Sequence, residues 1–353
     1  MRADEGDVAL PTLFMPFMDG LLAWPAQGGA LFLRAREGWP LHQRAWPGLV
    51  CEQSWRPEAD ALQRSGFSLV EADDAQRHPL VLVLPPRQRE ESRALLARAV
   101  ARCAPGGRVV ACLPNNEGAK SGEADLARLA GPLSSESKHK CRVFWTAPLD
   151  GPADADLMQQ WLQADAPRPI ADGRFVSRPG VFAWDRIDAA SRLLAGHLPT
   201  DLSGHAADLG AGYAYLSSEL LTRCPQITAL DLYEAELRAL ELARTNLAEF
   251  APRVKLQFHW HDVTRGLEHR YDAIVCNPPF HAQSRADRPD LGRRFIAVAA
   301  QSLKPRGRLW LVANRHLPYE AELAAHFAQV RTVAQQDGFK VVEAVRAGEG
   351  ASR

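Results

Sequence analysis

The chain lacks three features that would restrict its function: clustered cysteines, a long apolar run and a net charge. Its six cysteines are scattered, with no Cys-x-x-Cys and no histidine at zinc spacing, so we expect reduced thiols and no metal. No apolar run approaches the roughly 20 residues that span a bilayer. The acidic start, Met1–Asp7, has no basic and apolar regions of a signal peptide. We therefore expect a cytoplasmic protein with no membrane partner.

The charges balance, with 42 Lys and Arg against 42 Asp and Glu. A balanced chain has no global attraction to nucleic acid, so any such partner must be held by local patches. The length of 353 residues favours two domains over one.

Strands and helices alternate in the first half, which predicts an α/β fold with a parallel sheet. Short apolar runs at 30–34, 79–84 and 108–113 are typical of buried strands, and 90–103 has helical spacing. A stretch rich in Asp, Ala and Pro follows, with a short helix expected at 155–163. We predict a first domain at 1–150, a linker at 151–173 and a second domain at 174–353.

The second half contains Tyr-Asp-Ala-Ile-Val-Cys-Asn-Pro-Pro-Phe at 271–280. The run 273–276 predicts a buried strand, and the two prolines end it stiffly. Asn277 then stands at the carboxyl end of the strand, where open α/β sheets bind ligands. The Asn277 amide, the free Pro278 carbonyl and the flat ring of Phe280 could together hold a planar group that bears an exocyclic amine. An ordinary Asn-Pro turn is the alternative.

A second motif, Asp208-Leu-Gly210-Ala-Gly212, stands between an expected strand and an expected helix. Glycines let the backbone approach a ligand closely, and the start of the helix offers free N–H groups, as in nucleotide-binding turns. Ala214 replaces a third glycine and is small enough for close packing. Two further acids follow the next expected strands, Asp231 after 227–230 and Asp262 after 254–260.

The order acid-Gly-x-Gly, acid, acid, Asn-Pro-Pro-Phe resembles the amino-methylating class I S-adenosylmethionine-dependent methyltransferases. With Pro-Gly-Val-Phe at 179–182, the His281 that follows the motif and the run 312–319, the chain resembles the bacterial ribosomal RNA guanine-N(2) methyltransferases. The resemblance is strongest to the small-subunit 16S type and nearly as strong to the large-subunit type. Runs at 31–36 and 116–121 extend the resemblance into the first half. It implies two tandem Rossmann-like class I methyltransferase domains: a degenerate N-terminal one and a catalytic C-terminal one with a seven-stranded, mostly parallel sheet.

The resemblance also implies roles for individual residues in methyl transfer from S-adenosylmethionine to a guanine amine. Asn277 and the Pro278 carbonyl would accept from the amine, and Phe280 would stack on the base. The residues expected to bind the cofactor are Asp208 at its ammonium group, Asp231 at the ribose, Asp262 at the adenine, and Gly210, Gly212 and Asn277 around it.

The implied partner is ribosomal RNA or a ribosomal subunit, bound by a protein that we expect to be a monomer. The first half contains Leu84-Pro85-Pro86, which is similar to the catalytic motif but lacks the Asn and the aromatic residue. We therefore expect this domain to have lost its catalytic role and to help bind the RNA. An unrelated α/β domain with a coincidental Pro-Pro is the alternative. The side chains expected to contact substrate, if they are not simply solvated, are Phe182, Arg285, Arg288, Arg293, Arg294, Lys138 and Lys140.

Two other functions remain open from the sequence. A protein glutamine-amide methyltransferase also carries Asn-Pro-Pro, although more often with Tyr in fourth place and without such a preceding domain. A non-catalytic RNA-binding protein with a relict cofactor fold is the other.

Overall fold

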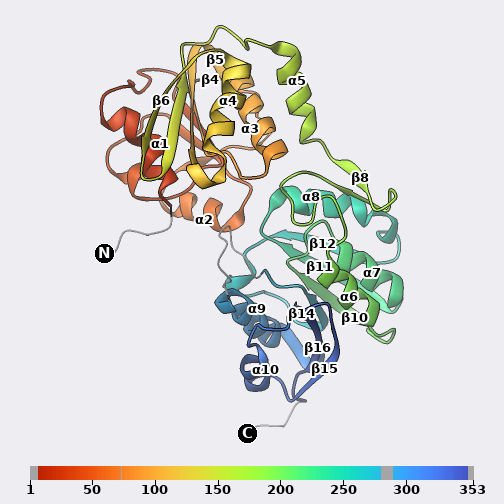
Figure 1. Cartoon of the computed structure of the whole chain (residues 1–353). Coiled ribbons are helices and arrows are strands. Elements are labelled where there is room, and N and C mark those ends of the chain that lie inside the picture. The colour runs from red at the N-terminus through yellow and green to blue at the C-terminus, as the bar shows by residue number, and fades with distance from the viewer. Residues whose placement is uncertain (1–6, 73, 280–288, 349–353) are drawn as a thin grey trace. The chain divides into compact units, whose positions relative to one another are not determined.

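The computed structural model describes residues 7–72, 74–279 and 289–348. The chain divides into two compact units (Figure 1). The first comprises Met1–Ala166 with Arg178–Gly180, and the second Pro167–Ser177 with Val181–Arg353.

Each unit is built on a seven-stranded sheet, and the two sheets have the same strand order. The order is β3-β2-β1-β4-β5-β7-β6 in the first unit and β12-β11-β10-β13-β14-β16-β15 in the second. Each sheet is parallel except at one side, where β7 and β16 run antiparallel to their neighbours. The predicted α/β fold with two tandem Rossmann-like domains is confirmed.

The first unit has helices on both faces of its sheet. Residues of α1 lie in the core on one face, and those of α3, α4 and α5 in the core on the other. Its strands are β1 (Ala30–Leu33), β2 (Leu49–Glu52), β3 (Ser68–Leu69), β4 (His78–Val83), β5 (Cys103–Pro114), β6 (Leu133–Lys138) and β7 (Cys141–Thr146). Its helices are α1 (Ala9–Met18), α2 (Arg56–Arg64), α3 (Arg89–Ala101), α4 (Ala119–Ala130) and α5 (Ala155–Ala164).

In the second unit, residues of α6, α7 and α8 lie in the core on one face of the sheet, and residues of α9 and α10 lie in the core on the other face. Its strands are β10 (Gly204–Leu209), β11 (Ile227–Glu234), β12 (Lys255–Trp260), β13 (Tyr271–Cys276), β14 (Leu303–Asn314), β15 (Gln329–Gln336) and β16 (Phe339–Val345). Its helices are α6 (Ala189–His197), α7 (Tyr215–Arg223), α8 (Leu237–Asn246), α9 (Pro289–Ser302) and α10 (Glu320–His326), and a small hairpin joins β8 (Arg168–Ile170) to β9 (Phe175–Ser177).

The predicted linker at 151–173 differs from the division in the structure. The helix α5 lies inside this stretch, and its Leu157 and Trp161 are buried in the core of the first unit. Arg93 of α3 lies over the Trp161 ring, 4.9 Å from its centroid. The first unit therefore runs on to Ala166, because the apolar face of α5 is needed to cover its sheet.

The sheets of the two units correspond strand for strand. Strands β5 and β14 have the same length and the same sequence of buried and exposed positions. Leu33 pairs with Val83 as Leu209 pairs with Cys276, so Arg34 occupies the place of Gly210, and Leu84 that of Asn277. Arg34 even keeps a left-handed φ of 54°. The first unit has thus lost the glycine turn and the amide, which supports the prediction that it is degenerate.

All six cysteines are free and buried. Within the described ranges, no helix is long and apolar enough to cross a membrane. The same part of the chain holds no group of three or more His, Cys, Asp or Glu side chains placed to bind a metal ion.

Candidate functional site

The glycine turn directly follows β10, as the sequence predicts. Gly210 has a φ of 76° and Gly212 a φ of 54°, a left-handed region that glycine enters without steric cost. Ala214 has a φ of 73°, is fully buried and precedes the first residue of α7. A methyl side chain fits there, but its backbone conformation costs on the order of 1 kcal/mol.

Asn277 lies beside this turn because β10 and β13 are parallel neighbours with Leu209 opposite Cys276. Parallel strands end at the same edge of the sheet, so the residues after them meet there. A small pocket with a volume of about 50 Å³ opens at this point. Its walls include both motifs and the start of α6: Phe182, Ala183, Asp188, Ser191, Gly210, Ala211, Gly212, Tyr213, Tyr215, Leu216 and Asn277.

The Asn277 amide is held by two residues that the sequence did not indicate. Its Nδ2 donates to Asp188 Oδ2 at 3.1 Å and to Ser191 Oγ at 2.9 Å. Asp188 also caps α6, because its Oδ2 accepts from the Ser191 backbone N–H at 2.8 Å. The sequence signal that was available is the capping pattern itself, an Asp just before an amphipathic helix.

Asp208 lies at the end of β10 and is completely buried. Its Oδ2 accepts from Ser217 Oγ at 2.7 Å, whereas its Oδ1 has no hydrogen-bond partner. Burial raises the pKa of this carboxyl to about 7, against a smaller opposing effect of the Ser217 hydrogen bond. Asp208 does not line the pocket. The contact of Asp208 with an ammonium group therefore stays a prediction.

The ribose contact of Asp231 stays a prediction, which the position of Asp231 within a strand does not favour. The predicted strand stops at Leu230, but β11 continues to Glu234, so Asp231 lies within the strand, opposite Ala207. It is 1% exposed, accepts from the Tyr271 hydroxyl at 2.8 Å and has His205 Nε2 at 3.1 Å from its Oδ1. Burial acts to raise its pKa, but the nearby His259 and His205 rings and the hydrogen bond from the Tyr271 hydroxyl outweigh this and lower it to about 2.

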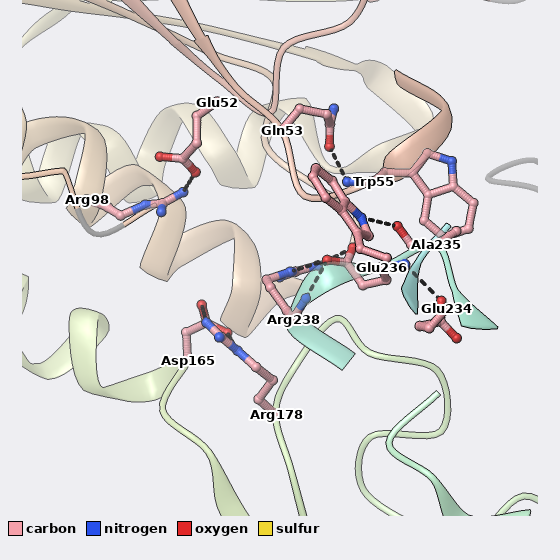
Figure 2. A network of polar contacts seen from close by, with 11 residues as sticks. Glu52, Gln53, Trp55, Arg98, Asp165, Arg178, Glu234, Ala235, Glu236 and Arg238 are labelled. Atoms are coloured by element: carbon pink, nitrogen blue, oxygen red, sulfur yellow. Dashed lines mark hydrogen bonds and ion pairs between the residues drawn. The ribbon is translucent and has the colours of Figure 1, made fainter. Parts of the chain in front are cut away.

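Glu234 is the acid that ends β11, and the sequence analysis did not single it out as a candidate for ligand binding. Its Oε2 accepts from the Gly212 backbone N–H at 2.7 Å, so it touches the glycine turn. Its Oε1 accepts from the Glu236 backbone N–H at 2.8 Å (Figure 2). Burial raises its pKa. A carboxylate has about four acceptor positions, which leaves room for the hydroxyls of a ribose.

Asp262 lies just past β12, on the far side of Glu234 from the glycine turn, since Glu234 pairs with Trp260. Its Oδ1 accepts from both the backbone N–H and the hydroxyl of Thr264, at 2.9 and 2.7 Å. This bond caps the short 3-10 helix Val263–Arg265. The contact of Asp262 with an adenine stays a prediction.

The residues expected to contact substrate are placed as follows. Phe182 is 59% exposed and lines the pocket. Arg293 and Arg294 are exposed on α9, and Arg294 Nε donates to the Thr264 carbonyl at 2.7 Å. Lys138 and Lys140 are exposed at the β6–β7 hairpin of the first unit. Phe280, Arg285 and Arg288 lie outside the described residues, and Pro278 is buried directly after Asn277.

Comparison with known proteins places the chain among methyltransferases. The sequence model of the family "Methyltransferase small domain" matches residues 172–343. The ribosomal RNA small subunit methyltransferase C of Pseudomonas aeruginosa (strain LESB58) is 34% identical over 263 residues, which is 74% of this chain and 77% of that protein. The enzyme of the same name from Psychromonas ingrahamii is 28% identical over 269 residues, 75% of each chain.

A solved structure matches both units. It is a T. thermophilus 16S rRNA N2 methyltransferase in complex with AdoMet and guanosine. The TM-score is 0.79 at 24% identity, over 97% of this chain and 92% of that one. At this identity the match shows the two-unit fold.

Proposed function

The chain belongs to the family of ribosomal RNA small subunit methyltransferase C, and on that premise we propose that it methylates the exocyclic N2 amine of a guanine in small-subunit ribosomal RNA. The methyl donor is S-adenosylmethionine. The observation that carries the proposal is the Asn277 amide in the same pocket as the glycine turn. An amide oxygen beside a glycine turn supports a site where an amine meets a nucleotide-like cofactor.

The residues present fit S-adenosylmethionine. Gly210 and Gly212 have no side chain to block a ligand that lies against the turn, and Glu234 stands at the next strand end for the ribose. The unpartnered Oδ1 of Asp208 is the kind of group that an ammonium satisfies. When bound, the cofactor supplies an electrophilic methyl group on a sulfonium.

The chain's contribution to the transfer is positioning and electrostatic stabilisation. The lone pair of a guanine amine is delocalised into the ring, so the amine is a weak nucleophile. Acceptance of its N–H protons by Asn277 Oδ1 and the Pro278 carbonyl would hold the nitrogen and favour a lone pair aimed at the methyl group. No general base is required to hold this geometry. A paired guanine must be unstacked first, at a cost of a few kcal/mol.

The first unit has the same sheet but no glycine turn, so its part is to bind RNA rather than cofactor. The exposed Lys138 and Lys140 suit contact with phosphates, which carry most of the affinity in such complexes. Phe182, at the pocket wall, suits stacking on the target base or its neighbour.

Mass-spectrometric mapping of ribosomal RNA tests the proposal. RNA from cells that lack this protein should miss one N2-methylguanosine in the small subunit, and a plasmid copy of the gene should restore it. A complete set of methylguanosines in the deletion strain would refute the proposal. Loss of a methylated glutamine from a protein instead would favour the glutamine-amide activity.

A further inference from the structure

We infer that Asp188 and Ser191 are positioning residues that fix which end of the Asn277 amide faces the substrate amine. The inference rests on the proposed function and deepens it. The acceptor at the centre of the reaction would then be set by the first turn of α6, 86 to 89 positions earlier in the chain.

The orientation of the amide follows from the chemistry of its neighbours. A carboxylate has no proton to donate, so the amide atom that faces Asp188 Oδ2 at 3.1 Å must be the NH2 group. The second N–H of that group is directed to Ser191 Oγ at 2.9 Å. Both amide protons are thus used within the protein. No described residue donates to Asn277 Oδ1, which leaves this oxygen to accept from a substrate.

The two partners are themselves held firmly. The Oδ2 of Asp188 also accepts from the Ser191 backbone N–H at 2.8 Å, which closes the first turn of α6. Ser191 is 8% exposed. The next residues of α6 anchor it to the sheet, since Leu194 and Ala195 lie in the core cluster with Val275 of β13. The turn that orients the amide is therefore fixed to the sheet that carries Asn277.

This arrangement answers a specific need of the reaction. A free asparagine amide can rotate by half a turn and present its NH2 group, and two donors then face each other. An amide that donates to a carboxylate cannot do so without placing its oxygen against a negative charge. The same hydrogen bonds polarise the amide, which makes its oxygen a better acceptor.

A double-mutant cycle separates this role from simple helix capping. Asn caps helices about as well as Asp, so Asp188→Asn should keep the fold and the melting temperature. It replaces the carboxylate with a neutral amide, whose oxygen can still cap α6 but holds the Asn277 NH2 group more weakly and no longer polarises the Asn277 amide with a full negative charge. We expect kcat to fall by about 10- to 100-fold, with the Kd for S-adenosylmethionine and the KM for RNA each within about threefold of wild type. In an Asn277→Ala background, Asp188→Asn should cause no further loss.

Ser191→Ala is the second variant and removes one acceptor only. It should lower kcat less than Asp188→Asn does, again with cofactor affinity kept. An additive effect of the two mutations at 188 and 277, or unchanged kcat in Asp188→Asn, would overturn the inference. A loss of cofactor binding that equals the loss of kcat would also overturn it, because Asp188 would then act on the cofactor.

One measurement does not depend on the function. The side-chain amide protons of Asn277, followed by NMR, should exchange slowly with solvent in the wild type and faster in Asp188→Asn. Equal exchange in both proteins would refute the positioning of Asn277 by Asp188 and Ser191, even if the RNA is methylated. Conversely, slow exchange in a wild type that transfers no methyl group to RNA would refute the proposed function but support the positioning of Asn277 by Asp188 and Ser191.

Discussion

Asp208→Asn should make the cofactor-free protein more stable at alkaline pH and not at acid pH. The Asp208 carboxyl is fully buried, and its pKa is raised from 3.8 to about 7. A raised pKa means that the folded chain holds this proton between these two values while the unfolded chain does not. The stability that the protonated Asp208 carboxyl contributes is thus fully present below about pH 4 and is lost as the pH rises through about 7.

The size of this loss follows from the two pKa values. The difference between 3.8 and about 7 corresponds to roughly 4 kcal/mol at high pH. Asn removes the charge but turns an N–H toward the place of the unpartnered Oδ1, which costs about 1–3 kcal/mol. We therefore expect a net gain of about 1–3 kcal/mol near pH 8.5 and little change or a net loss near pH 5.

Chemical unfolding without cofactor, at both pH values, measures this difference. Asp231→Asn is the matched control, because the pKa of Asp231 is lowered to about 2. Its carboxylate contributes stability that is present above about pH 4 and is lost only as the pH falls toward 2, so Asp231→Asn should be destabilised at both pH values. If Asp208→Asn behaves like Asp231→Asn, our view of Asp208 as a buried, unpaired carboxyl is refuted.

Two further predictions concern the cofactor pocket and its turn. Glu234→Gln should weaken S-adenosylmethionine binding by about 10-fold or more, since it removes a charged acceptor, whereas Asp231→Asn should leave the affinity within about threefold. Calorimetry measures both affinities. A larger loss of affinity in Asp231→Asn than in Glu234→Gln would show that Asp231 binds the ribose. Ala214→Gly should raise the free energy of unfolding by about 0.5–1 kcal/mol, because glycine adopts the φ of 73° without strain. Unfolding in urea tests this, and a lower stability would show that the Ala214 methyl group contributes more by packing than its backbone costs.

The sequence sufficed for the features that local patterns encode. Asn277 after an apolar run and the Gly210–Gly212 turn were placed correctly, since prolines and glycines mark where strands end.

Features that depend on pairing between distant segments could not be predicted. The end of β11 was set four residues early, at Leu230 instead of Glu234, because Leu-Tyr-Glu continues the strand only when β10 and β12 pair on either side. The contact of Asn277 with Asp188 joins residues 89 positions apart. Neither residue type nor spacing indicates it.

The most direct test of the account is the activity of Asn277→Ala with the cofactor bound. We predict that the purified variant binds S-adenosylmethionine within about threefold of wild type but methylates small-subunit RNA at least about 100-fold more slowly. The wild-type product, after digestion to nucleosides, should be N2-methylguanosine. Normal turnover by Asn277→Ala, or a wild-type methyl group on an atom other than that amine, would contradict the account.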